Sequence, residues 1–103
     1  MLNNNTTYNG WFNYATWRVN LEMFDGLTLE DVGFTPDGED RDDDEVELAN
    51  HLKEYAIERI EEQSSGLAQD YALTFIGYVN FREIAEHMLE DFCETNDRFY
   101  SED

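Results

Sequence analysis

Acidic side chains constrain this chain more than any other feature of its sequence, because a small body must keep nearly all of them at its surface. The 103 residues include 25 Asp and Glu but only six Lys and Arg, a formal net charge of −19. No acid lies between Met1 and Leu21, whereas twelve lie between Asp37 and Glu62. A surface of this kind repels nucleic acid and attracts proteins that bind nucleic acid.

The rest of the composition indicates a folded protein. Hydrophobic residues make up 41% of the chain and aromatic residues 15%, well above the content of acidic disordered segments. We therefore expect a single acidic helical domain over residues 1–103. Cys93 is the only cysteine, and the sequence shows neither a secretory signal nor a run of about 20 apolar residues. These features predict a cytoplasmic protein with no membrane segment.

Apolar spacing predicts four helices. The first begins with an N-cap at Asn13 and runs to about Phe24. Its apolar face is expected to consist of Tyr14, Trp17, Leu21 and Phe24. Glycines and Pro36 then interrupt the pattern, which predicts an irregular acidic connection from Asp25 to about Arg41. A long helix is expected over residues 42–64.

The last two helices differ in their polarity. The third, over about residues 67–79, is apolar nearly all round and is expected to be the most buried. Asn80, followed three residues later by Glu83, predicts the N-terminus of the fourth helix. Its inner face is expected to consist of Phe81, Ile84, Ala85, Met88, Leu89 and Phe92. The predicted fold is all-α, a compact bundle of about four helices.

The acids of the second and fourth helices form two rows. At 100° per residue, seven acids of the long helix fall within an arc of about 100° opposite its apolar residues. These are Asp43, Asp44, Glu47, Glu54, Glu58, Glu61 and Glu62. The row on the fourth helix is Glu83, Glu86, Glu90, Glu94 and Asp97.

The spacing of the first row resembles that of phosphates in DNA. Its charges extend over about 30 Å of helix, roughly one per 4 Å, and phosphates along one DNA strand are about 3.4 Å apart. The two rows are therefore predicted to imitate two strands and to bind phosphate-contacting Lys and Arg side chains. Two other interpretations are open. The rows are also typical of solvated helix faces and of halophilic adaptation, although uniform adaptation should have placed acids before Leu21 as well.

An uncharged aromatic segment opens the chain. Residues 8–17 read Tyr-Asn-Gly-Trp-Phe-Asn-Tyr-Ala-Thr-Trp and contain both tryptophans of the protein. Asn9-Gly10 suits a tight turn, and the aromatic side chains are suited to closing a small core. Packing is therefore the expected role, with direct binding as the alternative.

This segment resembles the start of a family of small phage and mobile-element proteins, which have an Asn-Gly-Trp-x-Asn-Tyr-x-Thr-Trp motif, here residues 9–17. A second similar block is Val-Asn-Phe-Arg-Glu-Ile-Ala-Glu-His, residues 79–87. The blocks cover less than a fifth of the chain, and the acidic middle is not a fixed part of the family. The resemblance implies an accessory protein of a class that includes inhibitors of restriction and CRISPR systems, located in the host cytoplasm if phage-encoded. It implies no catalytic residues.

Motifs for other chemistry are absent from the sequence. The acids of residues 37–45 do not match a twelve-residue EF-hand loop, and His51 and His87 stand alone without a metal-ligand pattern. Cys93 has no motif that connects it to a histidine. We therefore expect no catalytic residues, no metal, no cofactor and no enzymatic activity. The charge also argues against direct binding of nucleic acid.

The sequence thus predicts an anti-CRISPR or anti-restriction inhibitor. It would act as an acidic DNA mimic in the nucleic-acid channel of a basic host protein, such as a CRISPR effector or a restriction enzyme. The alternative is an acidic protein-protein adaptor or regulator that binds through the aromatic N-terminal segment.

Overall fold

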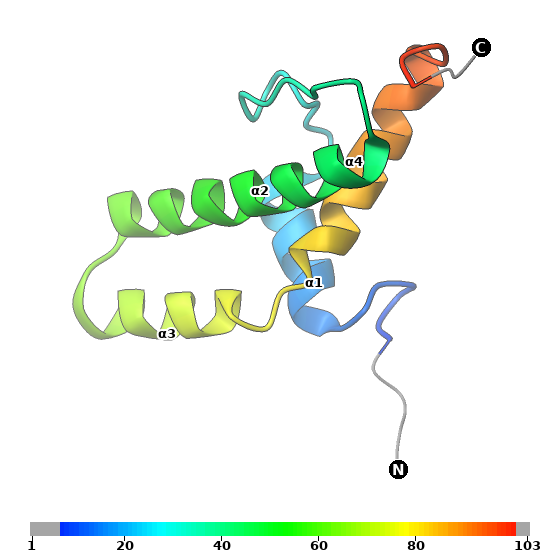
Figure 1. The fold of residues 1–103 in the computed structure, drawn as a ribbon. Coiled ribbons are helices and arrows are strands. Elements are labelled where there is room, and N and C mark those ends of the chain that lie inside the picture. Colours follow the sequence, from blue (N-terminus) through cyan, green and yellow to red (C-terminus); the bar gives the residue numbers. More distant parts are fainter. Residues whose placement is uncertain (1–6, 101–103) are drawn as a thin grey trace.

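The structure is a computed structural model that describes residues 7–100. These residues form four α-helices, α1 (Tyr14–Val19), α2 (Arg41–Gln63), α3 (Gly66–Ile76) and α4 (Phe81–Thr95), and a π-helical turn, η1 (Asn20–Phe24), continues α1. The only β-type pairing within residues 7–100 is an isolated bridge between Tyr8 and Trp11. The prediction of an all-α fold of about four helices is confirmed (Figure 1).

Side-chain caps determine where three of the helices begin. The Asn13 carboxamide oxygen accepts a hydrogen bond from the Thr16 N–H at 2.9 Å, and Asn80 caps α4 through the Glu83 N–H at 3.1 Å. Both caps were predicted from the sequence. Asp40 caps α2 through the N–H groups of Asp42 and Asp43, so this helix begins slightly earlier than expected. The acids in the first turn of α2 also stabilise the helix, because the N-terminal end of the helix dipole is positive.

The core lies where α2 and α4 pack against each other. Several side chains from both helices are completely buried there: Leu48, Leu52, Ala56, Ile84, Ala85 and Leu89. The connection between Asp25 and Asp40 is irregular, as expected, yet it also contributes to the core, because Leu29 and Val32 are each 4% exposed. The acidic connection is therefore held against the helices by its own apolar residues.

The predicted apolar face of the first helix is wrong. Ala15, Thr16 and Val19 are buried, whereas Tyr14 is 42% exposed and Leu21 48%. Phe24 is buried nonetheless. In a continuous α-helix Phe24 would lie about 140° away from Val19 around the axis, but the wider π turn rotates it back toward the core.

The prediction that the third helix is the most buried is also wrong. Ile76 is the only buried residue of α3, and Leu67 and Tyr71 are 64% and 70% exposed. The reason is the difference in length between α2, with 23 residues, and α4, with 15. The C-terminal part of α2 extends past the rest of the molecule, and α3 returns along this extension with a neighbour on one side only (Figure 1).

The overall shape reflects this extension. The radius of gyration is 14.9 Å, whereas a compact body of this length has about 13 Å. The extension of α2 places the acids near its C-terminus farther from the acids of other elements than a compact bundle would, and this reduces the repulsion between the two sets.

Candidate functional site

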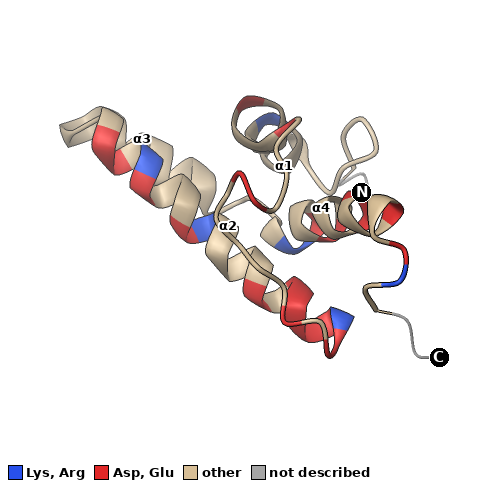
Figure 2. Cartoon of the chain, turned by 90° about the horizontal axis from the view of Figure 1, so that it is seen from above, with Lys and Arg blue, Asp and Glu red and all other residues tan. Residues whose placement is uncertain are grey.

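Six carboxylates of α2 form an exposed row on the side opposite the core. All of them are exposed: Asp43, Glu47, Glu54, Glu58, Glu61 and Glu62. The buried residues Leu48, Leu52 and Ala56 occupy the other side of the helix, as the 3.6-residue period requires. Figure 2 shows acidic residues at intervals along the whole length of α2. We call these six residues the α2 row.

Cationic side chains do not neutralise the α2 row. The ion pairs of residues 7–100 are Arg18–Glu22 and Arg82–Glu45, and neither involves a residue of the row. The Arg59 guanidinium donates to the Tyr55 hydroxyl at 3.0 Å and lies 5.1 Å from the ring centroid. This hydrogen bond raises the pKa of Arg59. Arg59 also interacts electrostatically with Glu62 of the row but forms no ion pair within residues 7–100, so the row keeps most of its negative charge.

Asp44 does not belong to the exposed row, and this part of the prediction is wrong. Its side chain is completely buried. Its carboxylate accepts hydrogen bonds from the N–H groups of Asp37, at 2.8 Å, and Gly38, at 3.0 Å, and from the Tyr100 hydroxyl. Burial alone would raise the pKa of Asp44, but these three hydrogen bonds outweigh it and hold the pKa below its ordinary value. Asp44 therefore stabilises the fold by joining the connection and the C-terminal segment to α2.

The row on α4 is divided in the same way. Glu86, Glu90 and Glu94 are exposed, but Glu83 is half-buried. The Oε1 atom of Glu83 accepts a hydrogen bond from the Phe12 N–H at 2.7 Å. The glutamate of the predicted start signal of α4 therefore holds the N-terminal segment. The other four acids of the predicted row remain exposed and can face a partner: Glu86, Glu90, Glu94 and Asp97.

The two rows lie on opposite sides of the molecule. Because α2 and α4 pack against each other through their apolar faces, their outer faces point away from the interface between them. A flat partner surface therefore contacts only one row at a time. This arrangement does not fit the expectation that the rows act together as two neighbouring strands, and the longer α2 row is the better candidate surface.

The aromatic N-terminal segment and the start of α4, which form the two blocks of the sequence resemblance, are in direct contact. The Asn13 amide donates to the Tyr78 carbonyl at 2.8 Å, and the buried Thr16 hydroxyl accepts from the Asn80 N–H at 2.9 Å. The rings of Trp11 and His87 stack with centroids 4.4 Å apart. These contacts give polar and aromatic residues of both blocks a packing role.

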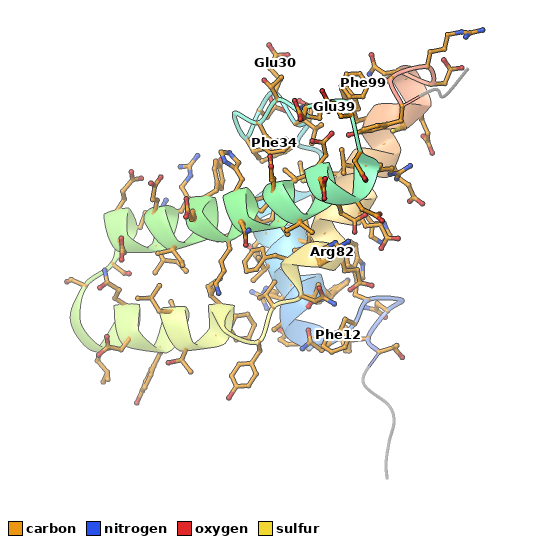
Figure 3. All side chains as sticks on the ribbon, in the orientation of Figure 1. Phe12, Glu30, Phe34, Glu39, Arg82 and Phe99 are labelled. Atoms are coloured by element: carbon orange, nitrogen blue, oxygen red, sulfur yellow. The ribbon has the colours of Figure 1, made fainter. Side chains whose placement is uncertain are left out.

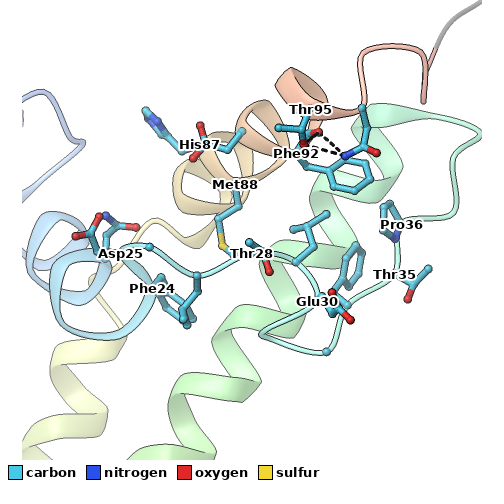
Figure 4. A pocket seen from close by; sticks show the side chains of 18 of the residues that line it. Phe24, Asp25, Thr28, Glu30, Thr35, Pro36, His87, Met88, Phe92 and Thr95 are labelled. Atoms are coloured by element: carbon cyan, nitrogen blue, oxygen red, sulfur yellow. Dashed lines mark hydrogen bonds between the residues drawn. The ribbon is translucent and has the colours of Figure 1, made fainter.

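A groove of about 980 Å³ runs between the connection and the C-terminal half of α4. Figure 4 shows Phe24, Met88 and Phe92 lining it. Asp25, Glu30 and Asp91 also line it, and no Lys or Arg does. No motif pointed to this groove, because much of its lining comes from the irregular connection, where the sequence has no periodicity. Its chemistry suits an apolar or cationic side chain of a partner.

Within residues 7–100, no three His, Cys, Asp or Glu side chains are placed to hold a metal ion. In the same part of the chain, no helix combines the length and the apolar composition needed to cross a bilayer.

Comparisons of this chain with protein-family models, with curated proteins and with solved structures found no match. The functional interpretation therefore depends on the geometry and charge of the surfaces described above.

Proposed function

We propose that this protein is a phage-type anti-defence inhibitor that acts as an acidic DNA mimic. The α2 row would occupy Lys and Arg side chains in the nucleic-acid channel of a CRISPR effector or restriction enzyme. The observation that supports this proposal is the set of six exposed carboxylates on one side of α2, none of them in an ion pair within residues 7–100. On this proposal the protein acts by binding and catalyses no reaction.

The charge spacing defines how such mimicry would work. From Asp43 to Glu62 the row extends over about 29 Å, so its six charges are on average roughly 6 Å apart, compared with about 3.4 Å between phosphates of one strand. The row therefore suits a channel that contacts phosphates at intervals. Displacement of counterions supplies affinity that is independent of base sequence, and the net charge of −19 accelerates association with a basic surface.

The experiment measures inhibition and competition with nucleic acid. Purified CRISPR effectors and restriction enzymes are titrated with the protein, and DNA binding and cleavage are followed at roughly 50 and 200 mM salt, a range over which multi-phosphate contacts lose orders of magnitude in affinity. We expect inhibition that competes with DNA and weakens steeply with salt. A complex that holds protein and DNA together, with affinity indifferent to salt, would contradict mimicry.

A matched pair of variants distinguishes the effect of the α2 row from the effect of total net charge. In the first, four residues of the row are changed to Gln: Glu47, Glu54, Glu58 and Glu61. In the second, four exposed acids outside both rows and outside the groove are changed to the corresponding amides: Asp37, Glu39, Asp42 and Asp70. Both lose four negative charges. We expect the first to lose inhibition and the second to keep most of it, whereas equal losses would show that only total charge matters.

The first of these variants should also remain folded. Gln retains the helix propensity of Glu, and removing like-charge pairs such as Glu54 and Glu58 relieves a few tenths of a kcal/mol each. Its melting temperature should therefore equal or slightly exceed that of the unaltered protein. A large fall in a thermal scan would show that these side chains serve the fold.

The second candidate function is an acidic adaptor that binds a protein through its aromatic N-terminal segment. It is favoured by the exposure of Tyr8, Phe12 and Tyr14, each between 40% and 44%. Capture of partners from host lysate at low salt separates the two functions. Loss of the captured protein on Phe12→Ser, with no loss on the four Gln substitutions, would favour the adaptor.

A further inference from the structure

The outer side of α3 and the turn after it expose three large apolar side chains. Leu67, Tyr71 and Tyr78 are 64%, 70% and 65% exposed. With the exposed Thr74 they lie along one side of the helix and of the turn that follows it. We call these four residues the α3 face. Figure 1 shows that α2 runs along one side of α3 and that no helix runs along the opposite side.

The charge around the α3 face limits which partners can bind to it. Asp70 is the only charged residue between Glu62 and Arg82, so a basic partner has little to bind here. A second copy of the chain also carries −19 and is repelled by the acidic rows. None of the four residues of the α3 face is charged, so two copies that meet there experience little local repulsion. We propose that it is the interface of a symmetric homodimer, an inference that does not depend on the proposed function.

The spacing of the four residues suits pairing of α3 with itself. They are separated by four, three and four positions, the spacing of apolar residues along a helix-helix contact. This spacing reads the same in both directions. In an antiparallel pair related by a two-fold axis, Leu67 therefore lies opposite Tyr78 of the second copy, and Tyr71 opposite Thr74. Such an interface uses the same patch on both protomers.

Neighbouring aromatic side chains enlarge the available area. The Tyr14 ring lies 6.3 Å from Phe75 on α3, and the Tyr8 ring lies 5.1 Å from Tyr14. With about 200 Å² for a full tyrosine side chain, the exposed parts of the four tyrosines and Leu67 provide at most roughly 500 Å² per protomer. A dimer would therefore bury at most about 1,000 Å² in total, the lower limit for a specific interface. We therefore expect a weak dimer.

The test is sedimentation equilibrium of the purified full chain, with no partner present, from micromolar to near-millimolar concentration at roughly 50 and 500 mM salt. The weight-average mass should rise from 12.1 kDa toward twice that value. Higher salt should favour the dimer, because it screens the repulsion between the two acidic copies. A chain that remains monomeric over this whole range overturns the proposal.

Two variants locate the interface. Tyr71→Glu adds a charge to the α3 face and should abolish the dimer, whereas Leu21→Glu makes the same change in charge at a residue that is 48% exposed outside it and should not. Both substitutions are at exposed positions, and circular dichroism checks that both variants fold. Equal dissociation of the two variants overturns the proposal.

A third variant tests the register. The double substitution Tyr71→Glu, Thr74→Lys places opposite charges across the two-fold axis and should regain the dimer. Failure to regain it overturns the antiparallel pairing.

Discussion

The buried carboxylate of Asp44 yields a quantitative prediction about stability. Tyr100→Phe removes the hydroxyl that donates to Asp44 and keeps the ring. A hydrogen bond to a charged group contributes about 1.5–3 kcal/mol. Asp44 retains its two backbone donors, from Asp37 and Gly38, so it is not left without partners. We expect the free energy of unfolding to fall by about 2 kcal/mol at neutral pH, which corresponds to roughly 10 °C in melting temperature for a domain of this size.

The same variant has a characteristic pH dependence. The pKa of Asp44 is lower in the folded protein than the ordinary value of about 3.9, so its stabilisation is present above that value and is lost as the pH falls through the folded pKa. Burial and the bond to Asp44 raise the pKa of Tyr100, so its stabilisation is present below about pH 10 and is lost at higher pH. The difference between the unaltered protein and Tyr100→Phe should therefore be constant between about pH 5 and 9 and shrink at both ends.

Urea denaturation followed by circular dichroism from about pH 2 to 11 measures this difference. Tyr78→Phe is the matched control, because it removes the hydroxyl of a residue that is 65% exposed, and its stability should not change. A loss smaller than about 0.5 kcal/mol for Tyr100→Phe, or a loss that stays constant over the whole pH range, would refute the assigned contacts of Asp44.

Three further predictions concern the contacts of the N-terminal segment, each measured by chemical denaturation. Trp11 packs against the core, whereas Trp17 does not belong to it. Trp11→Ala should therefore lower the free energy of unfolding by about 3–5 kcal/mol, and Trp17→Ala should lower it by less. The reverse order would contradict the assigned packing. Thr16→Val should cost about 1–3 kcal/mol, because it leaves the Asn80 N–H without its acceptor, and an unchanged stability would contradict that bond. Glu83→Gln keeps an acceptor for the Phe12 N–H and should cost no more than about 1.5 kcal/mol, whereas Glu83→Ala should cost more.

Local signals in the sequence were sufficient to predict the helices. Asn13 and Asn80 were recognised as caps because an N-cap acts on backbone groups only two or three residues away. Apolar spacing correctly identified the inner face of α4, where Ile84 and Leu89 are completely buried. Both kinds of signal depend on geometry within a single helix, and the sequence carries that information directly.

The wrong predictions concern burial, which depends on contacts between residues that are far apart in the sequence. The burial of α3 depends on how far α2 extends past α4, and apolar composition alone does not contain that length difference. The apolar face predicted for the first helix was wrong because a π turn before Phe24 alters the angular position of Phe24 around the helix axis. Asp44 lies within the arc that defined the row, but its partners Gly38 and Tyr100 approach it from the connection and the C-terminal segment, contacts that helical spacing cannot reveal.

The placement of the acids bears on the interpretation that they serve only solubility. Acids that serve solubility should lie where apolar side chains meet water. Leu67 and Tyr71 are 64% and 70% exposed, yet Asp70 is the only acid of α3. The carboxylates instead gather on the outer face of α2, where neighbouring like charges oppose folding. This separation of charged and apolar surface is expected if the two surfaces bind different partners, and it predicts opposite salt dependences: salt should weaken binding through the α2 row and strengthen association through the α3 face.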